Sequence, residues 1–313
     1  MPLTRGDLSA GLLLPGIKAV FFETYNAYIS GQPWADLVME IDSNKDLETY
    51  AWLGAVPKMK EWLGERTVES LNQSKFTITN KLYESTLSID RTAIEDDLYG
   101  QIRIKIQGLA YEAARHTEQM VFDIIKAGNT AGSTCYDGQL FFDTDHSNAG
   151  AEYTTNQSNT GTTALSTAAV QAAIIVMRKV KDDKGLPMGI NPTHMAVPVD
   201  LEWTAMEILE STYWPDTTGT SAYQKLPNNV LKGRLKLIVS PYLTDTTDWF
   251  LFDCSRPIKP IVLQKRTGVE FTALEGQSEA GFMRDQFLYG VRERKAVGYG
   301  LWQLAFGSIV SGA

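Results

Sequence analysis

The sequence predicts an α+β fold in which one long helix is followed by a compact α/β unit and a closing set of strands. Three patterns carry this prediction. Apolar and polar residues alternate with period two before residue 91, apolar residues recur every three or four positions over 92–127, and period two returns after residue 246. A period of two is typical of strands and a period near 3.6 is typical of helices.

The composition excludes several classes of protein. The 313 residues include 43% hydrophobic and 21% charged side chains, unlike a largely disordered or collagen-like chain. Two cysteines are too few for a disulfide scaffold, so an intracellular folding compartment is expected. No apolar run approaches the roughly 20 residues of a membrane span. The net charge of −8 argues against broad non-specific binding to DNA or anionic membranes.

The charge is unevenly distributed along the chain. Residues 256–295 carry a local excess of three positive charges, and because the whole chain carries −8, the remainder carries −11. Surfaces of opposite sign on one chain favour self-association, although ordinary solvated faces explain the same pattern equally well.

The first 50 residues show no clear period and combine glycines and prolines with irregularly spaced aromatic side chains. One short helix is expected around Ile17 to Ile29. An aromatic-rich but irregular segment does not bury itself, so it is expected to lie as an arm on the rest of the chain or on a neighbouring molecule.

Residues 64–91 are predicted to form one long polar-faced hairpin or a pair of hairpins. Threonines flank several of the alternating apolar residues, and β-branched side chains favour strands. Turns are expected at 71–74 and at Asn80–Lys81. The alternating apolar positions are Phe76, Ile78, Leu87 and Ile89.

The clearest element is a helix over residues 92–127. Thr92 and Glu95 have the spacing of a capping box, and the acidic run Glu95–Asp97 suits the positive end of the helix dipole. Gly128 and Asn129 end the pattern. About 30 residues at 1.5 Å each give about 45 Å, so the helix is expected to span the domain as a spine. Its apolar positions are Leu98, Ile102, Ile106, Leu109, Ala113, Met120 and Ile124.

Residues 147–163 are rich in Ser, Thr, Asn and Gly and are expected to form a loop before an α/β unit at 165–242. In this unit Ser166 and Asp200 are positioned to cap two helices. Its strands are expected at Met195–Val199 and Leu235–Val239. The last third alternates like a sheet, with strands expected at Trp249–Phe252, Ile261–Leu263, Val269–Phe271, Phe287–Val291 and Val297–Phe306.

Motifs of common catalytic and nucleotide-binding sites are absent. The chain has no GxxxxGK[ST], GxGxxG or HExxH pattern, and Gly276–Glu279 lacks the second glycine of a nucleophile elbow because Ala280 stands there. Cys135 and Cys254 could act as nucleophiles, but a small buried hydrophobe is the commoner role of cysteine. We therefore predict no catalytic residue and no cofactor.

The best enzymatic candidate is a metal site formed by Asp143, Asp145 and His146, with Asp137 nearby. Carboxylate and imidazole groups bind divalent metals, but a calcium-loop pattern that starts at Asp143 lacks both its glycine and its glutamate. The other interpretation is Asx-type turn chemistry that closes a hairpin, with Phe141–Phe142 in the core. A metal-assisted hydrolase is thus the first alternative function.

The order of elements, from arm through hairpin, spine helix and α/β unit to closing sheet, resembles the major capsid fold shared by tailed phages and herpesviruses. Five sequence blocks are similar to the Mu-like phage major head subunit family. They are Ala51-Trp52-Leu53-Gly54 with Pro57, Glu61-Trp62-Leu63-Gly64-Glu65-Arg66, Asn80-Lys81, Ile94-Glu95-Asp96-Asp97 with Gly100, and Tyr136-Asp137-Gly138-Gln139 running to Phe142-Asp143-Thr144-Asp145-His146. The resemblance covers most of the chain and is strongest between Tyr50 and His146.

The resemblance implies a structural protein rather than an enzyme: a major capsid protein whose copies form pentamers and hexamers. These would close an icosahedral shell around the packaged double-stranded DNA of a tailed phage or prophage. Assembly is expected in the host cytoplasm, and the protein's final location is the virion. The implied division of the chain is an N-terminal arm at 1–50, an extended loop with its base at 51–91, a peripheral domain at 92–164 with the spine helix at 92–127, an axial domain at 165–245, and return strands of the peripheral domain at 246–313.

The implied partners are other copies of the chain, a scaffolding protein, a portal and a candidate decoration protein, with DNA enclosed without sequence-specific binding and no membrane. Because the arm begins at Met1 without a long charged helical extension, the scaffold is expected as a separate chain. A related non-phage shell protein is the second alternative function. Contacts between subunits are expected at Phe76, Ile78, Lys81, Glu95, Asp96, Asp97, Arg292 and Arg294.

Overall fold

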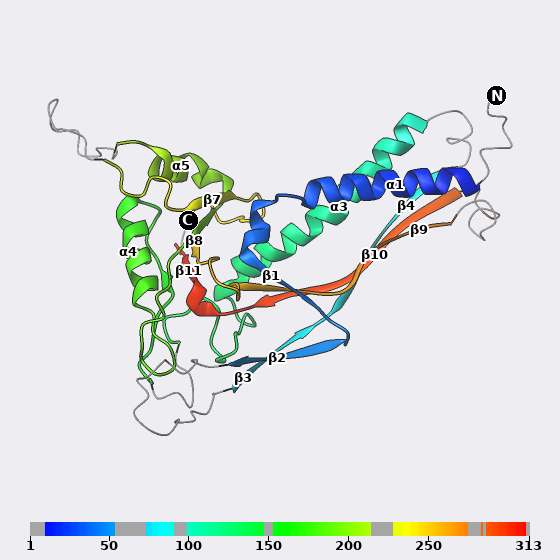
Figure 1. The fold of residues 1–313 in the computed structure, drawn as a ribbon. Helices are drawn as coiled ribbons and strands as arrows, with labels where there is room; N and C mark the ends of the chain where they lie inside the picture. The colour runs from blue at the N-terminus through cyan, green and yellow to red at the C-terminus, as the bar shows by residue number, and fades with distance from the viewer. Residues whose placement is uncertain are drawn as a thin grey trace, which may run out of the picture.

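The computed structural model describes residues 10–53, 73–90, 99–146, 153–213, 228–274, 283 and 286–310. These residues form an elongated limb, in which two helices lie beside long strands, and an α/β unit at one end of the limb (Figure 1). Helices and sheets are both major components, so the predicted α+β class is confirmed. None of the described helices combines the length and the apolar content that crossing a membrane requires.

The limb is built on a four-stranded sheet. Its strands, in spatial order, are β1 (Val38–Asp42), β9 (Ile261–Leu274), β10 (Gln286–Tyr299) and β4 (Lys81–Asp90). Strand β1 lies parallel to β9, whereas β9 and β4 both pair antiparallel with β10. The two short strands predicted at 261–263 and 269–271 are therefore parts of one long strand. Among the described strands, β4 and β1 are the outer ones, and each pairs with a neighbour on one side only.

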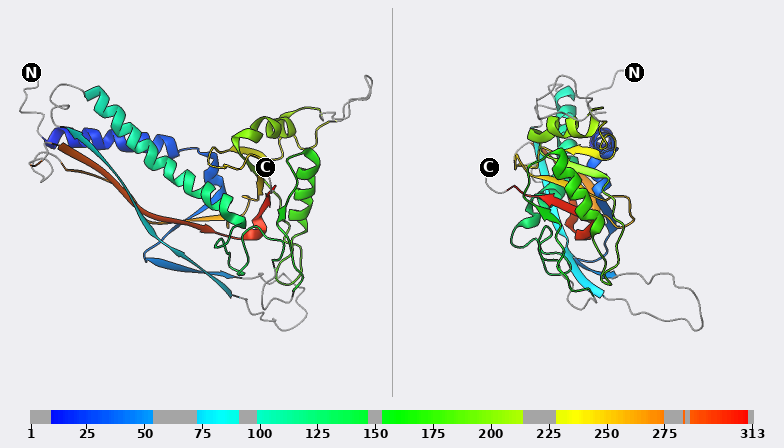
Figure 2. Two further views of the ribbon diagram at one scale, coloured as in Figure 1. Left: turned by 180° about the vertical axis from the view of Figure 1, so that it is seen from behind. Right: turned by 90° about the vertical axis from the view of Figure 1, so that its left-hand side faces the viewer.

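Helices α1 (Ala10–Ile29) and α3 (Tyr99–Lys126) pack together along this sheet (Figures 1 and 2). Helix α1 is longer than the predicted Ile17–Ile29. Its Phe21 ring is fully buried against Phe271 of β9, in a core that also holds Ile106 of α3. This part of the predicted arm thus lies on the body of its own chain.

The buried face of α3 follows the prediction only in its first half. Ile102 and Ile106 are buried as expected, but beyond them the buried stripe is displaced by one residue. The apolar stripe is wide, and spacing alone does not distinguish two adjacent helix faces. Beyond Ile106 the buried residues are Ala110, Ala114, Thr117, Val121, Phe122 and Ile125, whereas the predicted Leu109, Ala113, Met120 and Ile124 are only partly covered, and Leu98 lies outside the described residues.

The hairpin or pair of hairpins predicted at 64–91 is wrong, because the described strands of this segment both pair with strands outside it. Strand β3 (Gln73–Thr79), which includes part of the turn expected at 71–74, pairs antiparallel with the upstream strand β2 (Leu47–Leu53), while β4 pairs with β10. Asn80 is therefore a crossing point between two sheets and not a hairpin turn. Its backbone N–H donates to the Asp46 carbonyl at 2.9 Å, and its side-chain amide donates to the Lys45 carbonyl at 2.9 Å. These bonds anchor the crossing to the turn that precedes β2.

The α/β unit contains a five-stranded sheet flanked by helices α4 (Thr167–Lys179) and α5 (Glu202–Glu210). In spatial order its strands are β5 (Thr160–Gly161), β11 (Ala305–Ser308), β8 (Trp249–Phe252), β6 (His194–Val197) and β7 (Lys236–Val239). Strand β8 has the predicted bounds, and β6 and β7 lie within one or two residues of theirs. The sheet also includes β8 and β11, which the sequence assigned to the return strands.

One of the two predicted helix caps is present. The Ser166 hydroxyl accepts a hydrogen bond from the Ala169 backbone N–H at 3.2 Å, so the α4 cap is confirmed. The Asp200 cap is wrong, because a 3-10 turn, η3 (Val199–Leu201), follows Pro198 and leaves Asp200 inside the turn rather than at the N-cap of α5. Three further 3-10 turns are η1 (Pro33–Leu37), η2 (Ala127–Asn129) and η4 (Trp302–Leu304).

Candidate functional site

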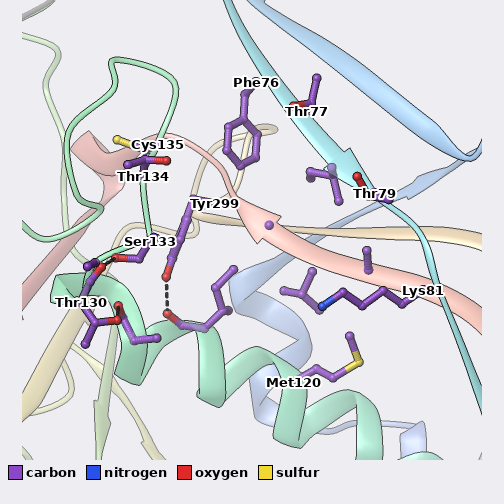
Figure 3. Close-up of a pocket in the computed structure, with 18 of the residues that line it drawn as sticks. Phe76, Thr77, Thr79, Lys81, Met120, Thr130, Ser133, Thr134, Cys135 and Tyr299 are labelled. Atoms are coloured by element: carbon purple, nitrogen blue, oxygen red, sulfur yellow. Dashed lines mark hydrogen bonds between the residues drawn. The ribbon is translucent and has the colours of Figure 1, made fainter.

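An open groove of about 750 Å³ lies where the β2–β3 ribbon meets the limb. Strand β3, the start of β4 and the end of β10 form one wall, and the last turns of α3 with residues 130–135 form the other (Figure 3). Its lining mixes apolar side chains with threonine and serine hydroxyls. The predicted contact residues Phe76, Ile78 and Lys81 all line this groove.

Close contact between Ile78 and Gly298 holds β3 against β10. A methyl group on Gly298 would lie 2.4 Å from the Ile78 Cδ1 atom, so only glycine allows the two strands to approach this closely. Ile78 is consequently 4% exposed and belongs to a core with Val262 and Ala296. Its side chain is already covered by its own chain, and Phe76 packs partly against the same core.

Among the described residues that line this groove, Lys81 is the one cationic side chain, and it has no ion-pair partner there. Its side chain is exposed and projects along the groove wall (Figure 3). Opposite it, the Tyr299 hydroxyl donates to the Ile124 carbonyl at 2.8 Å, which ties β10 to α3. The groove thus offers hydroxyls, apolar surface, the Cys135 thiol and one ammonium.

Arg292 and Arg294 both form ion pairs within the chain. Arg292 Nε lies 2.6 Å from Glu270 Oε2, its cross-strand neighbour on β9. Arg294 Nη2 lies 2.6 Å from Asp46 Oδ1, which Arg266 also contacts at 3.2 Å. Both arginines therefore have acidic partners within the chain, and an intersubunit role for either of them stays a prediction. The predicted contacts Glu95, Asp96 and Asp97, and the capping residue Thr92, lie outside the described residues.

The predicted metal ligands do not converge. Asp145 is exposed, and one Asp143 carboxylate oxygen accepts from the backbone N–H of the next residue, Thr144, at 2.6 Å. His146 is buried instead beside Asp137 and Cys135. The trio Cys135, Asp137 and His146 is the one group of potential metal ligands close enough to share an ion within the described part of the chain.

Hydrogen bonds already occupy the ligand atoms of this trio. Asn159 Oδ1 accepts from the Asp143 backbone N–H at 2.9 Å, which orients the amide, and His146 Nε2 lies 3.1 Å from the same oxygen. His146 Nδ1 lies 2.8 Å from Asp137 Oδ2, and the Cys135 thiol donates to Asp137 Oδ1 at 2.8 Å. Both ring nitrogens of His146 thus have hydrogen-bond partners within the chain.

These hydrogen bonds oppose metal binding. A metal needs an imidazole lone pair and a thiolate. Burial, and then the adjacent Asp137 carboxylate, raise the pKa of the Cys135 thiol well above its usual range. Burial alone would raise the pKa of Asp137, but the hydrogen bonds from His146 and Cys135 outweigh it and leave that pKa below its usual value. The His146 ring also stacks on Trp302, with ring centres 3.9 Å apart, so the trio is a hydrogen-bonded structural cluster in the core. Burial also raises the pKa of the Cys254 thiol, to about 12, which suits the structural role expected of both cysteines.

A second buried charge cluster, between α3 and β10, escaped the sequence analysis. Glu293 Oε1 lies 3.1 Å from His116 Nδ1 and contacts Lys295 Nζ, which also donates to Thr117 Oγ1 at 2.6 Å. Glu293 is 7% exposed and Lys295 is 3% exposed. A signal was present, because the alternation of β10 puts both residues on the same face as the buried Val291.

Irregular strand pairing occurs at the same point. The register between β9 and β10 shifts on both sides of Arg294, where β9 contributes extra residues. Such β-bulges bend a strand and redirect its side chains. Burial lowers the pKa of Lys295, whereas for Glu293 the His116 hydrogen bond and the Lys295 charge outweigh burial and lower the carboxyl pKa.

Acid should destabilise the chain through Asp137 and Glu293. Both folded-state pKa values lie below the ordinary carboxyl values of about 3.9 and 4.3, so the ionised forms stabilise the fold above that range. This stabilisation is lost as the pH falls through the lowered values. Urea unfolding at pH 7, 5, 4 and 3 should show a falling free energy of unfolding. The Asp137→Asn/Glu293→Gln variant should have a lower free energy of unfolding at pH 7 than the wild type and should lose less of it on acidification. An equal loss in the variant and the wild type would refute this assignment.

Comparison with known proteins gives consistent matches along the chain. The family described as Mu-like prophage major head subunit gpT matches at residues 12–164, 160–243 and 244–310. The Mu-like prophage FluMu major head subunit of Haemophilus influenzae is 30% identical over 275 residues, or 87% of this chain and 64% of that protein. The major capsid protein of Escherichia phage Mu is 27% identical over 270 residues, or 86% of this chain and 64% of that protein. The chain therefore spans slightly less than two thirds of the length of these relatives.

Solved structures show the same fold. A chain of the bacteriophage JBD30 procapsid is 28% identical, with a TM-score of 0.54 over 99% of this chain and 77% of that chain. A Mycobacterium phage Patience chain, 12% identical, has a TM-score of 0.55 over 100% of this chain and 96% of that one, and shows the fold alone. The fold and the family expected from the sequence blocks are both confirmed. The chain belongs to the Mu-like prophage major head subunit gpT family and has the fold of tailed-phage capsid proteins.

Proposed function

We propose that this chain is a major capsid protein, whose copies assemble into pentamers and hexamers that close an icosahedral shell around double-stranded DNA. The family match from residue 12 to residue 310 carries the proposal. The likeness to the JBD30 procapsid chain over 99% of the present chain supports it, because that protein is part of an assembled phage shell. The net charge of −8 suits a container that encloses DNA without adhering to it.

The open edge of the limb supports contacts between subunits. Strand β4 is an outer strand of its sheet, and Leu82 on it is 61% exposed. An unpaired strand edge readily accepts another chain. Lys81 begins this strand and lines the groove, so it is the proposed contact residue whose surroundings suit a neighbour best. Phe76 and Ile78 are largely covered by their own chain, and Arg292 and Arg294 would contribute only their exposed surfaces.

The remaining parts of the proposal follow the family. The scaffolding protein, the portal and the decoration protein would be separate chains, and shells would assemble in the host cytoplasm before the protein reaches its final place in the virion. The division into arm, extended loop, peripheral domain, axial domain and return strands is likewise proposed. In that division the axial domain would take β8 and β11 from beyond residue 245, because they complete its sheet.

The hydrolase alternative receives no support. The relatives named above are head subunits and capsid proteins. The metal candidate His146 is committed to an ion pair and an amide within the core, and Asp143 and Asp145 do not join it.

Sedimentation velocity and negative-stain imaging of the purified chain, alone and together with its neighbouring gene products, would test the proposed function. We expect capsomer-sized rings, tubes or closed shells. Nucleic acid extracted from closed particles would distinguish a genome container from a shell with protein cargo. A chain that stays monomeric at every concentration and with every neighbouring product would refute the proposal.

A further inference from the structure

Helix α4 is apolar on its outer face as well as on its inner face. Its inner residues, among them Val170 and Ile174, are buried in the α/β unit, yet Ile175 is 52% exposed and Val176 is 38% exposed. The exposed Ala172 continues this outer surface one turn earlier. A helix that is apolar all round is normally covered on all sides. The outer face of α4 therefore indicates a contact that the isolated chain leaves open.

A second apolar surface lies on η3 and α5. Trp203 is 75% exposed and Val199, four residues earlier, is 51% exposed. Tryptophan is the side chain most enriched at the centres of protein interfaces, because it buries a large area with little loss of conformational freedom. Exposed Asp200, Glu207 and Glu210 lie around this tryptophan in sequence. The α5 surface thus has an apolar centre, Trp203 and Val199, with acidic side chains beside it.

The two surfaces have opposite charge. Beyond Ile175 and Val176, helix α4 ends in the exposed cations Arg178 and Lys179. Among the described residues, Asp200, Glu207 and Glu210 have no ion-pair partner, and Arg178 and Lys179 have none either. Arg178 donates one hydrogen bond, to the Asn191 side chain at 3.3 Å. Each surface therefore has an apolar centre, and the charges that border one surface are opposite in sign to those that border the other.

The two surfaces also lie toward opposite edges of one sheet. Helix α4 packs against β11, next to the β5 edge, whereas α5 packs against β7, which is the other edge. Both helices are at the end of the molecule away from the limb (Figure 2). Two different complementary surfaces on opposite sides of a unit join copies head to tail, and a head-to-tail contact closes into a ring when its rotation allows.

We propose that the α4 face of one copy packs against the α5 face of the next, with Trp203 as the anchor, so that successive copies form a ring. This inference rests on the proposed self-assembly and adds to it the contacting helices and their head-to-tail direction. Arg178 and Lys179 of one copy would face Asp200, Glu207 and Glu210 of the next.

Two variants test the direction of the contact. Ile175→Asp disables the α4 face and Trp203→Asp disables the α5 face, and both positions are exposed, so the thermal unfolding of the monomer should not change. Under conditions in which the wild type assembles, each variant alone should lose at least about tenfold of its assembled material. An equimolar mixture should form a species of two subunits, one of each variant, because only one intact pair of faces remains. The conservative variants Ile175→Leu and Trp203→Phe should assemble.

Each other outcome overturns the inference in a distinguishable way. Wild-type assembly by both Asp variants would show that these faces are not contacts, while the proposed function would stand. Assembly by only one Asp variant would indicate a symmetric contact of one helix with its own copy. Normal shells that no longer bind a neighbouring gene product would assign the faces to that product. A wild type that never assembles would remove the proposed function together with the inference.

Discussion

Ile106→Asp should leave the chain unable to fold. Ile106 is fully buried at the centre of the contact between α3, α1 and the limb sheet. A carboxylate there would lack any partner, and the core would lose a large apolar side chain. We expect a loss of more than about 4 kcal/mol, which is a large part of the roughly 5–15 kcal/mol that stabilises a typical domain. Circular dichroism and urea unfolding of the purified monomer measure it.

Ile104→Asp on the same helix is the matched control. This residue is 67% exposed, so the same substitution buries no charge and should change the free energy of unfolding by no more than about 0.5 kcal/mol. Leu109→Asp should fall between the two, because Leu109 lies at the edge of the buried stripe. If Ile104→Asp unfolded the chain as completely as Ile106→Asp, the observed orientation of α3 would be wrong.

Glu293→Leu should destabilise the chain by about 3–5 kcal/mol, because it leaves the Lys295 ammonium buried without its counter-charge. Lys295 is 3% exposed, and its other polar contact is the neutral hydroxyl of Thr117. A hydroxyl does not replace a carboxylate as the partner of a buried cation. Urea unfolding at pH 7 measures the loss.

The double variant Glu293→Leu/Lys295→Met distinguishes a lost ion pair from damaged packing. Removing both charges together should recover most of the stability, since a well-packed apolar pair often equals or exceeds a buried ion pair. In a double-mutant cycle the two single effects should then be strongly non-additive, which gives a large coupling energy. A double variant that loses the simple sum of the two single effects would show that the residues do not act as a pair.

The candidate sites show where sequence reasoning succeeded and where it failed. His146 was named as a candidate metal ligand with Asp137 nearby, and the two do meet, but Cys135 joins them in place of the expected Asp143 and Asp145. Residues near one another in sequence share a turn, and the direction of each side chain depends on how that turn closes. Asp145 faces outward, and only a three-dimensional arrangement reveals that Asn159 reaches back to His146.

The exposed faces of α4 and α5 were also hidden from the sequence. Ile174 and Ile175 are adjacent and chemically identical, yet one is 4% and the other 52% exposed. The amphipathic pattern indicated that α4 is a helix but not which of its apolar residues the sheet would leave uncovered.

By itself, the sequence determined the kinds and the order of the elements. Period two identified strands such as β10, period 3.6 identified α3, and Ser166 marked the start of α4, because these signals depend on neighbours within a few residues. The five motif blocks determined the family. Tertiary structure alone decided that β4 pairs with β10 rather than β3, and that His116 and Thr117 of α3 contact Glu293 and Lys295. These outcomes depend on contacts between residues more than 100 positions apart, where local pattern carries no information about the partner.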